Sequence, residues 1–199
     1  MLRNKKALIP YLLLVAAIAG GILWYESSQV PRLGQVITTG QADVGGPFRL
    51  TDQNGKPVSD ADFRGRYMLI YFGYSFCPDV CPTTLGVMAE ALDKLGNGGT
   101  RIVPVFITID PQRDTPAVLK RYMAAFSPRF VGLTGSEAAI KDVEKKYRVY
   151  AARQPLDKGG YAMSHSSVIY LMGPDGKLVT FYDEAISPED LAKDLKSKT

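Results

Sequence analysis

Two cysteines, Cys77 and Cys81, are the only thiols of this 199-residue chain, and three residues separate them. They follow the apolar run 68–72, which is short and rich in β-formers and therefore predicts a buried strand. Residues 85–95 then carry apolar side chains at helical spacing. Cys81 is therefore predicted as the N-cap of a helix, with Pro82 at the first position, where a missing N–H costs nothing. The positive end of that helix favours the thiolate form of the sulfurs.

Two cysteines at this spacing can form a disulfide or share a metal ion, and spacing alone does not choose between them. A structural disulfide is the simpler interpretation for an exported domain. In the chain-entropy model, however, closing so short a loop stabilises a fold less than closing a long one. A close pair beside a helix start is more typical of redox-active or metal-binding sites. We therefore predict Cys77 and Cys81 as a redox dithiol or as part of a metal site.

The elements that must position these thiols alternate between strand and helix patterns. Strands are predicted at 67–72, 102–109 and 130–133, hairpins at 48–58 and 168–182, and helices from Pro82, Pro116, Ser136 and Pro188. This order predicts an α/β sandwich that is closed by an antiparallel hairpin. The segment 154–161 carries proline and glycine without periodicity, so it predicts a mobile loop, and this loop leads to His165, the only histidine.

Four sequence motifs together resemble the SCO/SenC family and occur in the order found in that family. They are Phe63–Arg66, Cys77–Pro82, Asp110–Pro116 and Ser164–Gly176. The family consists of membrane-anchored, thioredoxin-fold copper proteins that are used in assembling cytochrome c oxidase. The resemblance therefore implies a thioredoxin-like α/β fold with an N-terminal transmembrane helix. It also implies that Cys77, Cys81 and His165 bind copper.

The residue types themselves favour copper over zinc. Two thiolates and one imidazole form a soft set suited to Cu(I), and the Irving–Williams order places Cu(II) above other divalent first-row ions at such sites. Structural zinc takes four protein ligands, so it would need a carboxylate such as Asp79, which is more typical of a surface charge. Met163 offers a thioether but is more typical of packing. Ser164 stands where many family members have an acidic residue, which changes the charge of the site without removing a ligand.

Two further carboxylates, Asp110 and Asp114, lie between a predicted strand and a predicted helix. They suggest a second metal site or an acid–base pair. Aspartates in this position more commonly cap turns and helix starts, so we expect that role for both. No phosphate-binding loop and no serine nucleophile motif accompanies His165.

The N-terminal segment predicts a membrane anchor. Residues 7–25 contain no charged side chain, and their length nearly suffices to span a hydrocarbon core of about 30 Å. The basic segment 1–6 precedes them, so the positive-inside rule keeps it in the cytoplasm and exports the rest of the chain. A signal peptide that is cleaved after residues 17–19 is the alternative. Residues 26–46 are predicted as a juxtamembrane linker and residues 47–199 as the thioredoxin-like copper-binding domain.

Charge gives no support to a nucleic-acid partner. The net charge is +4, from 24 Lys and Arg against 20 Asp and Glu, and three of the positive residues lie in segment 1–6, which leaves 21 against 20. The resemblance instead implies a single-pass protein of the bacterial inner membrane facing the periplasm, or of the mitochondrial inner membrane facing the intermembrane space.

The function implied by the resemblance is copper delivery to the CuA site of cytochrome c oxidase subunit II during oxidase assembly. An upstream periplasmic copper donor and a thioredoxin-like reductant are the other implied partners. The alternative is an enzyme, a thiol–disulfide reductase that uses Cys77 and Cys81 to keep the CuA-site cysteines reduced. A thiol peroxidase is a third alternative, but its usual surrounding residues are not evident.

Overall fold

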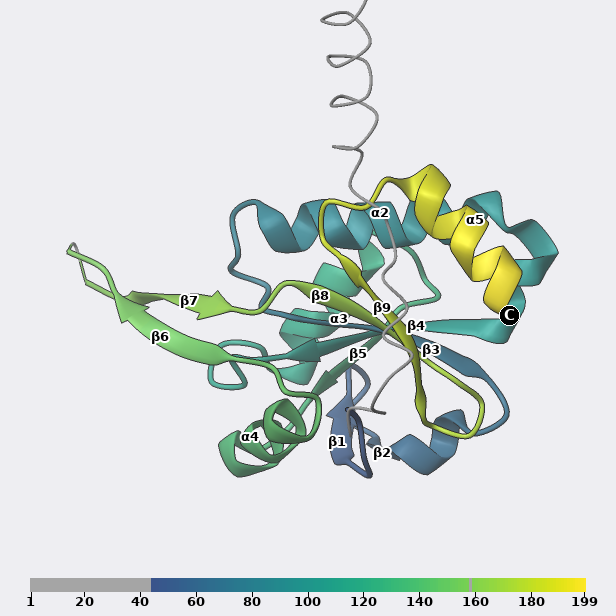
Figure 1. Cartoon of the computed structure of the whole chain (residues 1–199). Helices are drawn as coiled ribbons and strands as arrows, with labels where there is room; N and C mark the ends of the chain where they lie inside the picture. Colours follow the sequence, from purple (N-terminus) through teal and green to yellow (C-terminus); the bar gives the residue numbers. More distant parts are fainter. Residues whose placement is uncertain (1–43, 158) are drawn as a thin grey trace, which may run out of the picture. The chain divides into compact units, whose positions relative to one another are not determined.

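A seven-stranded sheet forms the centre of the computed structural model, which describes residues 44–157 and 159–199 (Figure 1). In sheet order the strands are β2 (Pro57–Ser59), β1 (Arg49–Asp52), β5 (Val131–Thr134), β4 (Ile102–Thr108), β3 (Tyr67–Gly73), β8 (Val168–Met172) and β9 (Leu178–Asp183). Strands β3, β4 and β5 are parallel, whereas the other neighbouring pairs are antiparallel. The predicted α/β class with a closing antiparallel hairpin is confirmed.

The two central strands of this sheet are buried on both faces. Leu69, Ile70 and Phe106 have no exposed surface, and every residue of β4 is buried. Strands covered on both faces need continuous apolar sequence rather than alternation, because neither row of side chains meets water. The buried strands predicted from the apolar runs 67–72 and 102–109 are therefore confirmed.

In the part of the chain that the structure describes, four α-helices pack around the sheet. They are α2 (Val80–Lys94), α3 (Pro116–Ala124), α4 (Glu137–Lys146) and α5 (Pro188–Lys198), with the short 3₁₀ helices η1 (Asp60–Phe63) and η2 (Gly96–Arg101). Helices α3, α4 and α5 begin within one residue of their predicted starts. The hydroxyls of Thr115, Ser136 and Ser187 cap them, because each accepts a hydrogen bond from the N–H three residues later. Helices α2 and α5 pack together on one side of the sheet, and α4 lies on the other side (Figure 1).

Successive residues of β3 face these two layers in turn. The Tyr71 side chain points to the α2 side, where its hydroxyl reaches Cys81. The next residue, Phe72, packs on the other side against Tyr147, which ends α4, and against Tyr170 of β8, with ring centroids 5.4 and 6.0 Å apart. The cysteine chemistry therefore belongs to the α2 side.

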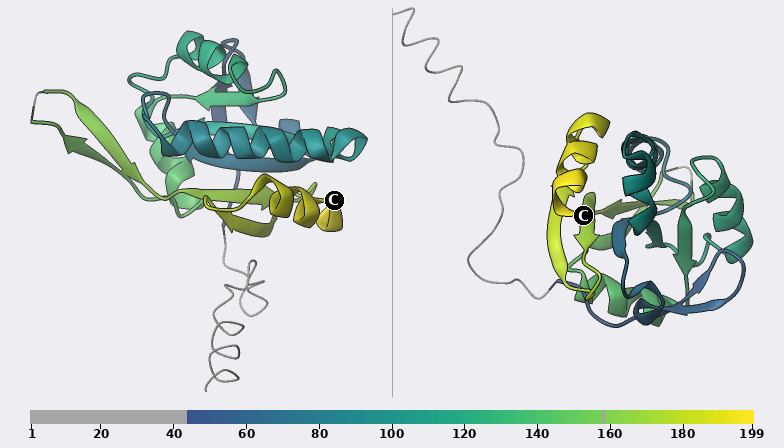
Figure 2. Two further views of the ribbon diagram at one scale, coloured as in Figure 1. Left: turned by 90° about the horizontal axis from the view of Figure 1, so that it is seen from above. Right: turned by 90° about the vertical axis from the view of Figure 1, so that its right-hand side faces the viewer.

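A separate hairpin carries His165. Its strands β6 (Ala151–Pro155) and β7 (Tyr161–His165) pair with each other and form a two-stranded sheet apart from the main one. The hairpin extends away from the main sheet in Figures 1 and 2. The prediction of a mobile loop over 154–161 was wrong at both ends, because Gln154 and Pro155 belong to β6 and Tyr161 belongs to β7. Gly159 and Gly160, with φ of 85° and 79°, supply the turn, while the exposed polar residues of β6 offer no apolar alternation to recognise.

The predicted transmembrane anchor, residues 7–25, lies outside the described residues. Within residues 44–157 and 159–199, no helix combines the length and apolar character needed to cross a membrane. The prediction of an anchor therefore stays a prediction.

Candidate metal centre

The two thiols lie where β3 hands over to α2, as predicted, but the helix begins earlier than expected. Asp79 is the N-cap, so Cys81 and Pro82 are the second and third helical residues, and the predicted start at Cys81 was wrong by two positions. Proline costs no intrahelical hydrogen bond there, because the first four N–H groups of a helix have no intrahelical partner. The Cys81 N–H instead donates to the Cys77 sulfur at 3.4 Å. The Cys77 sulfur therefore lies at the positive end of the helix.

The Cys81 sulfur is enclosed by the core. Cys81 is completely buried, and the Tyr71 hydroxyl donates to its sulfur at 3.9 Å. Burial raises the pKa of Cys81 to about 12. A hydrogen bond to the backbone of Tyr74 lowers this pKa, but by less than burial raises it. The prediction that the helix end favours a thiolate here was wrong for Cys81, because loss of hydration outweighs the helix dipole. Cys77 is only half-buried, and both thiols are free.

His165 approaches the buried thiol from the end of β7. Its Nε2 atom lies 3.6 Å from the Cys81 sulfur, although 84 residues separate the two in sequence. Its Nδ1–H donates to the Ser166 carbonyl at 3.0 Å, because a carbonyl can only accept. This hydrogen bond fixes the tautomer whose Nε2 lone pair faces the sulfur, an arrangement common among metal-binding histidines.

Two tyrosine rings hold the imidazole from the sides. The rings of Tyr71 and Tyr74 meet the His165 ring edge to face, with centroids 6.3 and 6.0 Å apart. Both tyrosines are buried, so they exclude water from the contact between imidazole and thiol. A buried aromatic enclosure of this kind fixes the orientation of the ring.

The three predicted donors are gathered without forming a closed metal cage. Among residues 44–157 and 159–199, no group of three or more His, Cys, Asp or Glu side chains converges enough to hold a metal ion. Cys81 and His165 are adjacent, whereas the Cys77 sulfur is turned to the Cys81 amide. The donor types suit copper, and binding requires loss of the thiol protons. Cys77 nevertheless lies close enough to the Cys81 thiol to contribute to the raised pKa of Cys81.

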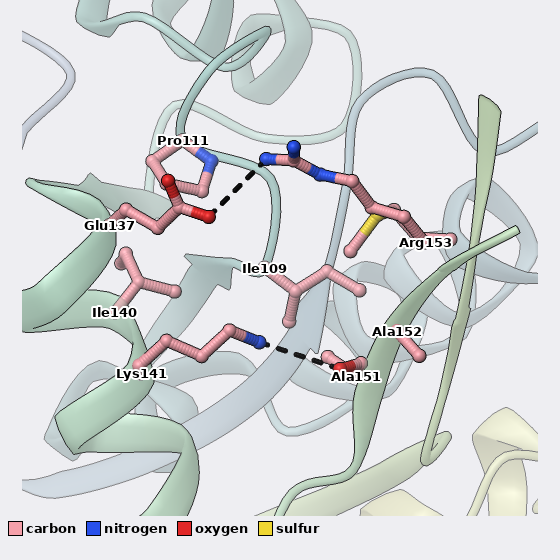
Figure 3. A pocket seen from close by; sticks show the side chains of 9 residues that line it. Ile109, Pro111, Glu137, Ile140, Lys141, Ala151, Ala152 and Arg153 are labelled. Atoms are coloured by element: carbon pink, nitrogen blue, oxygen red, sulfur yellow. Dashed lines mark hydrogen bonds and ion pairs between the residues drawn. The ribbon is translucent and has the colours of Figure 1, made fainter. Parts of the chain in front are cut away.

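Asp79 and Met163 take the structural roles predicted for them. Asp79 is exposed at the N-cap of α2, and its side chain makes no capping hydrogen bond. Met163 is buried, and its side chain lines a cavity of about 190 Å³ between α4 and the base of the hairpin (Figure 3). Ser164, on the opposite face of β7, is exposed.

Asp110 and Asp114 are not the turn and helix caps that we predicted. Both are buried, and Thr115 caps α3. Asp114 accepts hydrogen bonds from Ser75, in the cysteine loop, and Asp110 accepts one from Tyr161, in the hairpin. Sequence reasoning missed this role, although one signal pointed to it. Because β3 and β4 are adjacent and parallel, the residues that follow them must meet at the same edge of the sheet.

An α/β fold with two free thiols at a strand-to-helix junction, one of them buried against an imidazole, defines a thioredoxin-like protein built for metal binding or disulfide exchange. The chain belongs to the SCO1/SenC family, whose model matches residues 37–199. The predicted family resemblance is confirmed. The SCO2-like protein of Rickettsia felis is 42% identical over 178 residues, which cover 88% of this chain and 87% of that relative.

Solved structures of the family have the same fold. Bradyrhizobium japonicum ScoI, solved with copper bound, is 46% identical with a TM-score of 0.73, and the match covers 78% of this chain and 99% of that chain. BsSco is described as a member of the Sco family of cytochrome c oxidase assembly proteins in which a disulfide switch was identified. It is 27% identical with a TM-score of 0.65, over 82% of this chain and 97% of that chain.

Proposed function

We propose that this chain is a membrane-anchored copper chaperone that carries copper on Cys77, Cys81 and His165. The contact of 3.6 Å between Nε2 of His165 and the Cys81 sulfur carries this proposal. The Nε2 lone pair of His165 is directed at the thiol, so the two atoms can share a metal ion once the thiol proton is lost. The copper-bound structure of the related ScoI protein supports the choice of metal.

The unequal burial of the three donors suits a carrier rather than a permanent metal site. Cys81 and the His165 ring are enclosed by Tyr71 and Tyr74, which keep water and solutes away from bound copper. Cys77 lies in the half-buried loop, where a thiol of a partner protein can reach it. Copper is the cargo, and the half-buried Cys77 sulfur is the position at which a partner's ligands replace those of this chain.

The destination that we propose is the CuA site of cytochrome c oxidase subunit II. The relationship to BsSco, a cytochrome c oxidase assembly protein, supports this choice. In this proposal residues 7–25 anchor the chain in the bacterial inner membrane or its mitochondrial equivalent, and residues 26–46 give the domain its reach. An upstream copper donor loads the site.

The asymmetry of the two thiols supports a second candidate function, disulfide reduction. The Cys77 thiolate attacks a partner disulfide, forms a mixed disulfide and releases one partner thiolate. The Cys81 thiolate then attacks the Cys77 sulfur and releases the second partner thiolate. The chain ends oxidised as a Cys77–Cys81 disulfide, and the partner has gained two electrons and, from solvent, two protons. A thioredoxin-like reductant then returns the pair to thiols. The disulfide switch of BsSco supports this candidate.

Metal content tests the leading proposal directly. The full chain, purified without oxygen and with its thiols reduced, is expected to take up one equivalent of copper. Stable binding of zinc with no uptake of copper would contradict the proposal.

Replacing His165 by alanine separates the two functions, because it removes the imidazole and leaves both thiols in place. Loss of one of three ligands should weaken copper binding by more than the roughly 10–100-fold typical of changes to groups that only support a ligand. Disulfide reduction should persist, because it needs only the thiols. His165→Ala should therefore reduce a test disulfide in vitro but fail to restore oxidase assembly in cells that lack this protein, at limiting copper.

The matched control is Cys77→Ser, which both candidate functions predict to be inactive in the same cells. Full restoration by His165→Ala together with an inactive Cys77→Ser would reject the copper chaperone and leave the reductase.

A further inference from the structure

The buried carboxylate of Asp114 ties the cysteine loop to the sheet. It accepts hydrogen bonds from the Ser75 N–H at 3.0 Å, the Ser75 hydroxyl at 2.5 Å and the Thr108 hydroxyl at 2.6 Å. Ser75 lies two residues before Cys77, and Thr108 ends β4. These three bonds therefore fix the start of the loop that carries the first thiol.

A second set of contacts, made by Asp110 and Arg113 of the same segment, holds the hairpin. The Tyr161 hydroxyl donates to Asp110 at 2.8 Å, and Arg113 donates to the Tyr161 carbonyl at 2.9 Å. The Arg113 guanidinium also lies over the Tyr161 ring, 3.9 Å from its centroid, and forms an ion pair with Asp110. Tyr161 and His165 occupy the same face of β7, because side chains four residues apart in a strand point the same way. These contacts therefore fix the strand that carries the imidazole.

Arg113 joins the two sets. Besides Tyr161, its guanidinium lies 4.9 Å from the Phe76 ring centroid and 5.6 Å from that of Tyr74. Phe76 is the residue before Cys77. A single planar cation is therefore packed between the cysteine loop and the histidine hairpin, a geometry that lysine cannot reproduce.

The hairpin has no strand pairing with the main sheet, so its position depends on side-chain contacts such as these and those of Tyr71 and Tyr74 with His165. Its strands pair with each other and not with the main sheet. The cavity of about 190 Å³ is lined by Ala151, Ala152 and Arg153 of β6 and by Glu137, Ile140 and Lys141 of α4 (Figure 3). The ion pair of Arg153 with Glu137 across this cavity is 3.5 Å long and exposed, so it contributes little.

We infer that Asp110, Arg113 and Asp114 form a positioning clamp that sets the separation between the thiols and His165, with the Tyr161 hydroxyl as its contact to the hairpin. The clamp touches no metal and acts through the segments that it holds. The inference concerns the site of the proposed copper function and rests on that function for its consequence. Its structural content, restraint of β7, applies to the metal-free protein as well.

Tyr161→Phe tests the clamp with the smallest change available. It removes the hydroxyl from Asp110 and keeps the ring against Arg113, so the fold is expected to survive. Tyr150→Phe is the matched control, because Tyr150 adjoins the same hairpin and its side chain is 59% exposed. Both variants are made in the full chain.

Two measurements are expected to move together in Tyr161→Phe. Amide hydrogen exchange over residues 161–165 of the metal-free protein should accelerate severalfold. Affinity for Cu(II) should fall by about tenfold, as when a group that orients a metal-binding histidine is lost, with weaker nitrogen coupling in the electron paramagnetic resonance spectrum. Tyr150→Phe should change neither measurement.

Each other outcome has a definite meaning. Unchanged exchange overturns the clamp, whatever the copper affinity. Faster exchange with unchanged copper affinity and spectrum overturns its positioning role. If the wild-type chain binds no copper, the proposed function fails, and the exchange data alone decide whether the clamp exists.

Discussion

The cysteine junction and the histidine hairpin face each other across 3.6 Å, yet they are held in opposite ways. Cys81 is completely buried at the end of a central strand and the start of a long helix. The hairpin that carries His165 pairs only with itself and lies beside a cavity. Packing of the core therefore positions the buried thiol, whereas a few polar and aromatic contacts position the imidazole.

Under the proposed copper function, this difference means that one ligand is held firmly and another is held by few contacts. A ligand embedded in close-packed core cannot move without disturbing many neighbours. A ligand on an outlying hairpin can move when one or two hydrogen bonds break, at a cost of about 1 kcal/mol each. We therefore expect changes at the junction to alter the stability of the fold and changes at the hairpin to alter the affinity of the site.

Oxidation of the two thiols removes both sulfur ligands of the proposed copper site, so we expect it to have the largest effect on copper binding. A disulfide between Cys77 and Cys81 consumes both thiolates, so it should abolish copper binding entirely while leaving His165 in place. The measurement is copper uptake by the full chain before and after oxidation, with quantified free thiols. Re-reduction with a phosphine is the control and should restore uptake. Undiminished affinity in the oxidised protein would place the copper site elsewhere.

The sequence predicts the junction well because the junction depends on local pattern. Continuous apolar runs indicate strands buried on both faces, and hydroxyl residues before prolines indicate helix starts. The error of two residues at α2 arises because proline is tolerated throughout the first helical turn, not only at its first position. The predicted thiolate character of Cys81 failed because burial, a tertiary property, dominates its pKa.

The hairpin was harder to predict from sequence because few buried apolar side chains hold it. Its strands bury little apolar surface, so no periodic pattern marks them. Asp110 and Asp114 looked like local caps, because sequence does not show that they lie buried between two segments. The proximity of His165 to the cysteines was expected from the fold of the resembling family, not from the residues alone.

Adding one methyl group at Gly73 tests how closely the junction is packed. A Cβ at this position would lie 3.0 Å from the Cys81 sulfur, 3.0 Å from the Phe106 ring and 3.1 Å from the Tyr71 ring. All three neighbours are buried, so Gly73→Ala should lower the free energy of unfolding by roughly 1–3 kcal/mol, the usual cost of overpacking. Urea denaturation of the full chain measures the change.

Gly86→Ala is the matched control within α2. A Cβ there would have no atom within 4 Å, and alanine favours a helix over glycine, so this variant should gain roughly 0.5–1 kcal/mol. If Gly73→Ala left the free energy of unfolding unchanged, the junction would not be closely packed. The contrast between the junction and the hairpin would then be lost.

The smallest effect is expected from the charge of Asp114, on the cysteine side of the clamp. Burial raises the pKa of Asp114, and its hydrogen bonds from Ser75 and Thr108 oppose that shift only in part. A carboxyl group whose pKa is higher in the folded than in the unfolded chain stabilises the fold fully below the unfolded pKa. That contribution is lost as the pH rises through the folded pKa.

Asp114→Asn should therefore remove a pH dependence rather than a large amount of stability. The amide keeps the shape of the carboxyl group, its oxygen can accept from the Ser75 N–H and Thr108, and its NH₂ can donate to the Ser75 hydroxyl. As the pH rises from about 4 towards 7, wild-type stability should decline relative to the variant, because only the wild type must ionise this buried group. Urea denaturation of wild type and variant at several pH values gives the difference. A wild-type advantage over Asp114→Asn that grows with pH would mean that the ionised carboxylate is held more strongly than the neutral acid, and would reverse the sign assigned to its burial.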